Sequence, residues 1–216
     1  MAKWELTVRR RPTGDPADVH AQLVRTLQSL PEPWRLQHPA PLRPRTGEAT
    51  ATIKVRGRLG QGVAGSATYV FRSDRHAGDE RFDDVFSFVF DPGKVQIAPI
   101  AAAVLPALVQ ALDAYRACVN DRDGPAPWQD HAAVDRTTSL APEEGHGIHR
   151  LSPLAYYDDA LIQTELGIDS RTFAQRARGW VGQFHHGVLV TMPVSAARAD
   201  QFEASDEALR VLARMG

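Results

Sequence analysis

Hydrophobic and polar positions alternate with a period of two residues in four stretches of the chain. These stretches are residues 4–9, 51–56, 67–72 and 86–91. Successive side chains of a strand point to opposite faces of a sheet, so the pattern predicts strands with one buried face. Glycines at 57, 60, 62 and 65 separate two of the stretches, and a strand follows them rather than a helix. They therefore predict a hairpin turn and not a phosphate-binding loop, which needs a helix N-terminus.

Apolar residues at a spacing of three or four predict helices between these strands. Asp15 can cap a helix that begins at Pro16, and its apolar face ends before Pro31. A second stripe comprises Ile100, Val104, Leu108, Leu112 and Val119, with Pro106 inside it. We expect this stripe to form one long helix that covers the sheet.

The remainder of the chain predicts smaller elements. Asp169 and Ser170 can cap a helix that carries Phe173, Ala177, Trp180 and Val181. Residues 186–192 form an apolar run that predicts a buried strand, and residues from 205 on predict a last helix. The expected fold class is therefore α+β, an antiparallel β-sheet covered by helices. We expect one domain over residues 1–216, and the polar, proline-bearing segment 120–145 is where an internal boundary would fall.

Charge and composition exclude several classes of protein. The chain has 25 basic and 26 acidic residues and a net charge of −1, so it has no overall attraction for nucleic acid or for an anionic membrane. The single cysteine, Cys118, excludes an internal disulfide and a multi-cysteine zinc site. The longest apolar stretch, residues 97–109, is shorter than the roughly 20 residues of a membrane-spanning helix. The first residues contain no apolar signal segment, so we expect a cytoplasmic protein.

Histidines are candidates for a metal site. His146 and His149 follow Glu143 and Glu144, and His185 and His186 are adjacent further along the chain. Imidazoles at such spacings can share one metal ion. A metal-dependent enzyme built on His146, His149, His185 and His186 is therefore one hypothesis. Against it, the first two histidines lie on no expected helix, and the second two would point to opposite faces of a strand.

Other residues favour binding rather than catalysis. Cys118 falls near the C-terminal end of an expected helix, where the helix dipole disfavours a thiolate nucleophile. Arginines at 9, 10 and 11 suggest a basic face, which we interpret as solvated strand surface because stacking aromatics are missing from it. Tyr156, Tyr157, Asp158 and Asp159 combine aromatic area with charge, and we expect them to form part of a partner-binding surface. Alternatively, the two aspartates begin a helix and Tyr156 packs in the core.

The C-terminal third resembles a known family. It runs from His149-Arg150-Leu151-Ser152-Pro153-Leu154-Ala155-Tyr156-Tyr157 through a helix with Trp180 into His186-Gly187-Val188-Leu189-Val190-Thr191-Met192-Pro193. A polar stretch and a closing helix follow. This arrangement resembles the immunity protein 52 family of bacterial polymorphic toxin systems. The order strand, helix, antiparallel strands and helix in the first two thirds is similar too.

The resemblance implies a non-catalytic protein-binding module. We expect a bacterial immunity protein that blocks a cognate toxin by steric and electrostatic occlusion, without catalytic residues, cofactor or metal. The hypotheses beside it are the histidine metalloenzyme and a homo-oligomeric structural protein. The sequence leaves the oligomeric state and the identity of the toxin open.

Overall fold

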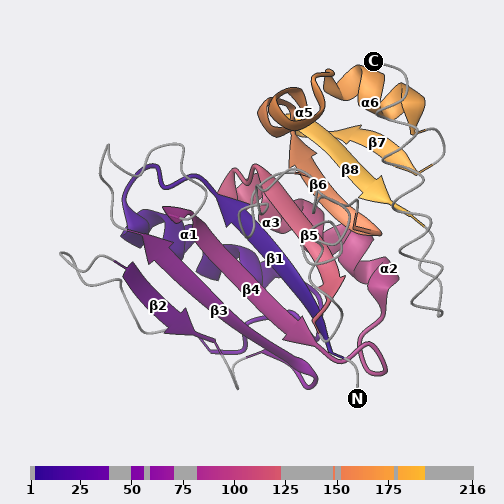
Figure 1. Ribbon diagram of the computed structural model, residues 1–216. Coiled ribbons are helices and arrows are strands. Elements are labelled where there is room, and N and C mark those ends of the chain that lie inside the picture. The colour runs from indigo at the N-terminus through magenta and orange to yellow at the C-terminus, as the bar shows by residue number, and fades with distance from the viewer. Residues whose placement is uncertain are drawn as a thin grey trace, which may run out of the picture. The chain divides into compact units, whose positions relative to one another are not determined.

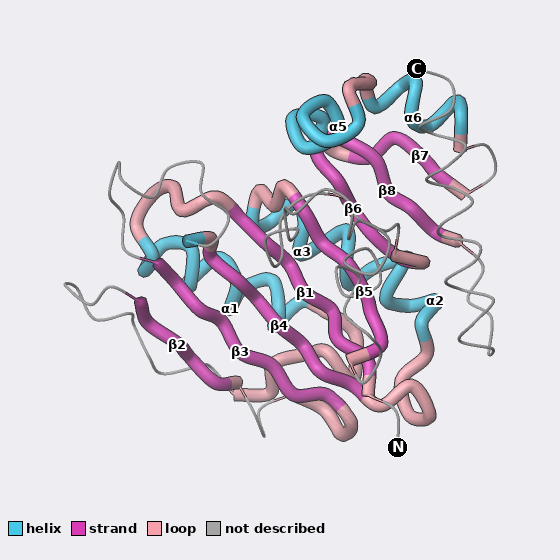
Figure 2. The backbone as a smooth tube through the Cα atoms, in the orientation of Figure 1, coloured by secondary structure: helices cyan, strands magenta, loops and turns pink. Residues whose placement is uncertain are grey.

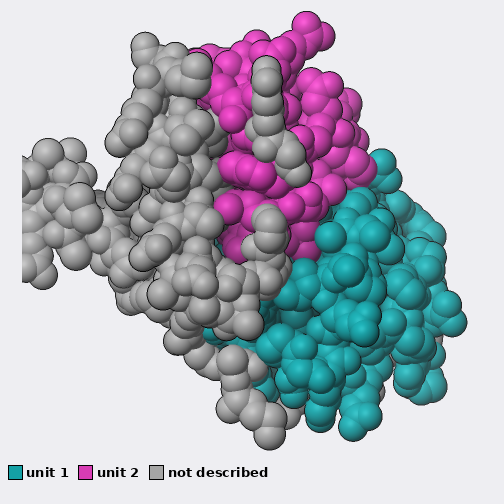
Figure 3. Space-filling model, turned by 90° about the vertical axis from the view of Figure 1, so that its right-hand side faces the viewer, with its two compact units in different colours: residues 1–122 teal, residues 123–216 magenta. Residues whose placement is uncertain are grey.

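The computed structural model describes residues 3–38, 50–55, 59–70, 82–122, 148, 152–177 and 180–192. The chain divides into two compact units, Met1–Arg122 and Asp123–Gly216 (Figure 3). The division falls inside the segment 120–145, where an internal boundary was expected. The expectation of a single domain stays a prediction.

Unit 1 contains a five-stranded antiparallel sheet (Figure 1). Its strands are β1 (Trp4–Arg10), β2 (Thr50–Lys54), β3 (Val63–Val70), β4 (Asp84–Phe90) and β5 (Arg116–Asp121). They lie side by side in the order β2-β3-β4-β1-β5. Each of the four stretches with a period of two contributes a strand to this sheet, so the expected antiparallel arrangement is confirmed.

One face of this sheet forms the core of unit 1. Leu6 and Val8 of β1 lie opposite Phe88 and Phe86 of β4, and all four are at most 1% exposed. The helices α1 and α3 lie behind the sheet in the view of Figure 2. Trp34, which follows α1, packs edge-on against Phe88 with ring centroids 6.0 Å apart. The alternation therefore divides β1 and β4 into a buried side and a half-exposed side, as their sequences predict.

The helix α1 (Pro16–Ser29) begins where the sequence predicts. The Asp15 side chain accepts a hydrogen bond from the Ala17 N–H at 2.8 Å, and Pro16 occupies the first turn. A capping carboxylate supplies an acceptor for an N–H group that the helix itself leaves unbonded. Val19, Leu23 and Leu27 are buried along one side of the helix.

The second predicted helix is shorter than expected. It consists of α2 (Ile97–Pro99), a π-helical turn η3 (Ile100–Val104) and α3 (Leu105–Leu112). Asp113 then adopts a left-handed conformation (φ 47°) and ends the helix. Val119 and Cys118 lie in β5, so the prediction that places them on or at the end of this helix is wrong. The apolar spacing of α3 continues to Val119 because this residue faces the core of unit 1 from β5.

Unit 2 contains a smaller antiparallel sheet in the order β6-β8-β7. The chain runs through β6 (Leu154–Asp158), α5 (Asp159–Leu166), α6 (Ser170–Arg176), β7 (Val181–Phe184) and β8 (Gly187–Thr191). The capping role of Asp169 is confirmed, since its side chain accepts from the Thr172 N–H at 2.6 Å. The helix ends at Arg176, so the expectation that Trp180 and Val181 belong to it is wrong. Val181 instead begins a strand.

Both units combine antiparallel strands with helices, and the fold class α+β is confirmed. No helix in the described ranges is long and apolar enough to cross a bilayer. The helix expected from residue 205 lies outside the described residues.

Candidate functional site

Two groups of candidate residues that are far apart in the sequence meet at one end of the unit 2 sheet. The Asp159 N–H donates to the His186 carbonyl oxygen at 2.8 Å. Asp158, at the end of β6, lies opposite Gly187, the first residue of β8. The aspartate pair and the histidine pair are therefore neighbours on this end of the sheet.

His185 and His186 form the two-residue turn between β7 and β8 rather than part of a strand. Both side chains are exposed. His185 has a positive φ of 50°, a conformation that two-residue hairpin turns require. The two rings lie with centroids 4.1 Å apart and planes inclined by 47°, so they do not point to opposite faces.

The metal-site hypothesis also includes two further histidines, His146 and His149. His146 and His149 lie outside the described residues. Among the residues that are described, no group of three or more His, Cys, Asp or Glu side chains is arranged to hold a metal ion. The metalloenzyme hypothesis therefore gains no geometric support from His185 and His186.

The two tyrosines of the candidate surface lie in the interior. Tyr156 and Tyr157 each have 0% of their surface exposed. Tyr156 packs edge-on against Phe184 of β7, with ring centroids 6.0 Å apart. The structure thus corrects the expectation that the two rings offer contact area to a partner, because Leu154–Tyr157 is buried on both sides of the strand. The exposed part of the candidate surface is carboxylate.

The two aspartates have different roles. Asp158 is the N-cap of α5, and its side chain accepts from the Leu161 N–H at 2.7 Å. Asp159 occupies the first turn of α5 and is exposed. The alternative interpretation, that the pair begins a helix, is therefore confirmed, and Asp159 remains available to a partner.

We expect substitution to separate these roles. Asp158→Ala removes the acceptor for the Leu161 N–H and should lower the free energy of unfolding by about 1 kcal/mol. Asp159→Ala removes an exposed charge and should change it by less than about 0.5 kcal/mol. Urea unfolding of the two variants measures the difference. Equal losses would contradict the assignment of Asp158 as the cap.

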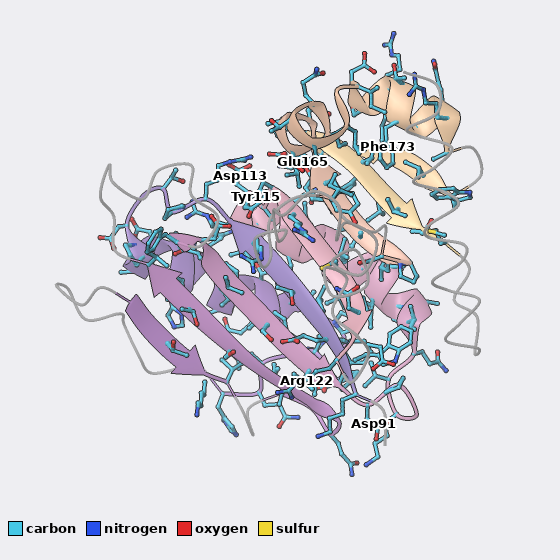
Figure 4. The ribbon with its side chains drawn as sticks, in the orientation of Figure 1. Asp91, Asp113, Tyr115, Arg122, Glu165 and Phe173 are labelled. Atoms are coloured by element: carbon cyan, nitrogen blue, oxygen red, sulfur yellow. The ribbon has the colours of Figure 1, made fainter. Side chains whose placement is uncertain are left out.

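The surface around α5 is acidic. Between Leu154 and Ser170 the chain carries four carboxylates, Asp158, Asp159, Glu165 and Asp169, and neither lysine nor arginine. Glu165 and Asp169 are exposed, and Glu165 stands near the end of α5, apart from the buried Phe173 (Figure 4). The hydrogen bond from the Thr172 N–H lowers the pKa of Asp169 below its usual value, so this carboxylate is charged at neutral pH. This part of unit 2 therefore presents negative charge.

The hairpin next to it was not predicted as a hairpin. Trp180 and Phe184 are half-buried, whereas Gly182 and Gln183 between them are exposed. Gly187 comes so close to β6 that a Cβ there would lie 2.1 Å from the Tyr157 carbonyl oxygen. The sequence signal for the hairpin is weak, because two histidines take the place of the Asn-Gly or Asp-Gly pairs that usually mark such turns.

Arg10, the last residue of β1, connects this strand to the start of β4 and to the end of α3. Arg10 donates to the Leu112 carbonyl oxygen at 2.8 Å and to Asp84 at 3.3 Å. Its side chain is 13% exposed and that of Asp84 is 0% exposed. The interpretation as solvated surface is wrong for Arg10, because it is part of a buried ion pair.

Arg9 and Arg11, on either side of Arg10 in the sequence, contact Asp83 and Tyr115. Arg9 lies 3.7 Å from Asp83, which also accepts a hydrogen bond from the Tyr115 hydroxyl. The Arg11 guanidinium lies 4.5 Å from the centroid of the Tyr115 ring. Arg9 and Arg11 thus surround a buried acid and its tyrosine, and this cluster has a structural role in unit 1.

Comparison with known proteins identifies a related fold. No family model matches the chain, and no curated protein matches it. Among solved structures, the chain is similar to the Pseudomonas aeruginosa T6SS protein PA0821, with a TM-score of 0.53 and 10% sequence identity. The similarity covers 98% of this chain and 76% of that one. The two proteins share the α+β fold along nearly the whole chain.

Proposed function

We propose that this chain is a bacterial immunity-type protein that binds a cognate T6SS toxin in the cytoplasm and blocks it by steric and electrostatic occlusion. The observation that carries the proposal is the shared fold with a T6SS protein over 98% of the chain. The resemblance of residues 149–193 to the immunity protein 52 family supports the same function from the sequence.

The charge of unit 2 supports a protein partner. Asp159 and Glu165 are exposed on α5, and Asp158 lies half-buried beside them. A cluster of like charges accelerates association with a surface of opposite charge and restricts the choice of partner. The toxin surface that this helix meets should therefore be basic.

The test uses the full chain and a secreted toxin encoded beside it. Cells that express the toxin alone should stop growing, and cells that also express this chain should grow. The purified proteins should form a complex whose association slows as salt is added, because screening weakens charge attraction. Replacing both Asp159 and Glu165 with lysine should slow association. The same reversal at two exposed acids of unit 1, Asp18→Lys with Glu32→Lys, is the matched control and should slow it much less.

Two results would count against the proposal. One is a wild-type chain that neither binds the toxin nor restores growth. The other is a complex whose association rate is the same in low and high salt, which would remove the electrostatic part of the mechanism while leaving steric occlusion.

A further inference from the structure

His185 and His186 are exposed titratable side chains to which the proposed function assigns no role. They form the turn between β7 and β8, and their ring centroids lie 4.1 Å apart. Histidine is the side chain whose charge ordinarily changes between pH 5 and pH 8. Two adjacent histidines on one turn can therefore add two positive charges to a small area of surface as the pH falls through this range.

The histidine turn lies against the negatively charged start of α5. The Asp159 N–H donates to the His186 carbonyl oxygen at 2.8 Å, so the two backbones are in contact. Asp158 lies opposite Gly187, the residue that follows the histidines. Charges on neighbouring residues interact through water, because the screening length at physiological salt is about 8 Å. The two histidines and the two aspartates therefore belong to one electrostatic surface.

The hairpin itself contains no other group that can change its charge near neutral pH. From Trp180 to Met192 the chain has no lysine, arginine, aspartate or glutamate. The elements that pack on β7 and β8 are β6, α5 and α6. Their titratable or charged side chains, with the caps of the two helices, are the buried Tyr156 and Tyr157, the acids Asp158, Asp159, Glu165 and Asp169, and the bases Arg171 and Arg176. Among these described residues, the histidines are the groups whose titration near neutral pH alters the charge beside α5.

We propose that His185 and His186 make the binding of the toxin dependent on pH. This inference rests on the proposed function, in which the acidic surface at α5 attracts a basic surface of the toxin. When both rings are neutral, Asp158 and Asp159 set the charge at this end of the sheet. When both rings are protonated, two positive charges lie beside the two carboxylates and offset them. Attraction for a basic partner then falls, and the toxin associates more slowly.

The test compares the association rate of the full chain with the toxin at pH 8.0 and at pH 5.5, at one ionic strength, by stopped-flow fluorescence. His185→Asn with His186→Gln removes both titrating rings, and asparagine tolerates the positive φ of residue 185. Every variant binds the same toxin, so titration of the toxin itself affects all of them alike. We expect the rate to fall about fivefold more for wild type than for this double variant. His38→Gln is the matched control, because it removes an exposed histidine of unit 1 and should keep the wild-type response.

A measurement on wild type alone keeps the test decisive if circular dichroism shows that the double variant misfolds. In 1 M salt the screening length is about 3 Å, so the effect of pH on the wild-type rate should nearly vanish. Equal falls for wild type and the double variant, or a wild-type fall that persists in 1 M salt, would overturn this inference and leave the proposed function standing. If wild type does not bind the toxin at pH 8.0, the proposed function fails and this inference with it.

Discussion

Gly187→Ala should lower the free energy of unfolding by about 3 kcal/mol, the upper part of the range for overpacking a filled interior. The new methyl group would lie 2.1 Å from the Tyr157 carbonyl oxygen and 2.7 Å from the Asp158 Cα. Both atoms are backbone atoms of β6, so no side-chain rotation relieves the clash. Separating β8 from β6 would also disturb Asp158, which caps α5. Urea unfolding of the full chain measures the loss.

Gly182→Ala is the control for this prediction. It makes the same chemical change on the neighbouring strand, where a Cβ meets no atom within 4 Å. We expect its free energy of unfolding to stay within about 0.5 kcal/mol of wild type. If Gly187→Ala and Gly182→Ala shift the unfolding midpoint equally, the close approach of β8 to β6 is not what the structure indicates.

The second large effect is expected at the buried ion pair of unit 1. Asp84→Ala removes the carboxylate that pairs with the guanidinium of Arg10, a side chain that is 13% exposed. It also removes the acceptor of the Val70 N–H, which lies 3.0 Å from Asp84 Oδ1. Removing one member of a buried pair typically costs about 3–5 kcal/mol, because the remaining charge stays out of water. Arg10 keeps hydrogen bonds to Thr13 at the surface, so we expect a loss at the lower end of this range, about 3 kcal/mol, in urea unfolding.

A double variant separates this cost from the value of the pair itself. Arg10→Met combined with Asp84→Leu removes both charges and should recover part of the stability that Asp84→Ala loses. The cost of losing the Asp84 acceptor for the Val70 N–H remains in both variants. Lys94→Ala, at an exposed cation after β4, should stay within about 0.5 kcal/mol of wild type. A loss from Asp84→Ala no larger than that from Lys94→Ala would falsify the description of the pair as buried and essential.

Local signals allowed the elements of unit 1 to be predicted. The start of α1 needs only Asp15 and Pro16, and both act within one turn of the helix. The strands β1 and β4 alternate strictly because only one of their faces packs on helices. The prediction failed at Asp113, where a left-handed residue ends the helix. A spacing of seven residues from Leu112 to Val119 fits a helix as well as a strand that faces the same core.

The candidate site was predicted only in part, for a related reason. The aspartates could be predicted to begin a helix, because capping depends on neighbouring residues. The burial of Tyr156 was one of two interpretations, and the burial of Tyr157 was not predicted, because Leu154–Tyr157 is buried at every position and no alternation marks its faces. The proximity of His186 to Asp159 depends on pairing between β6 and β8, which short-range patterns do not specify.

The pairing of β1 with β4 has a register that both charge and burial favour. Arg10 lies opposite Asp84 in this register, while Arg9 contacts Asp83 just before β4. A shift of one residue would turn every side chain of the moving strand to the opposite face. The phenylalanines of β4, which are at most 1% exposed, would then turn to water. The alignment of these two strands is therefore set by the burial of the aromatic rings, and the two ion pairs add to it at one end.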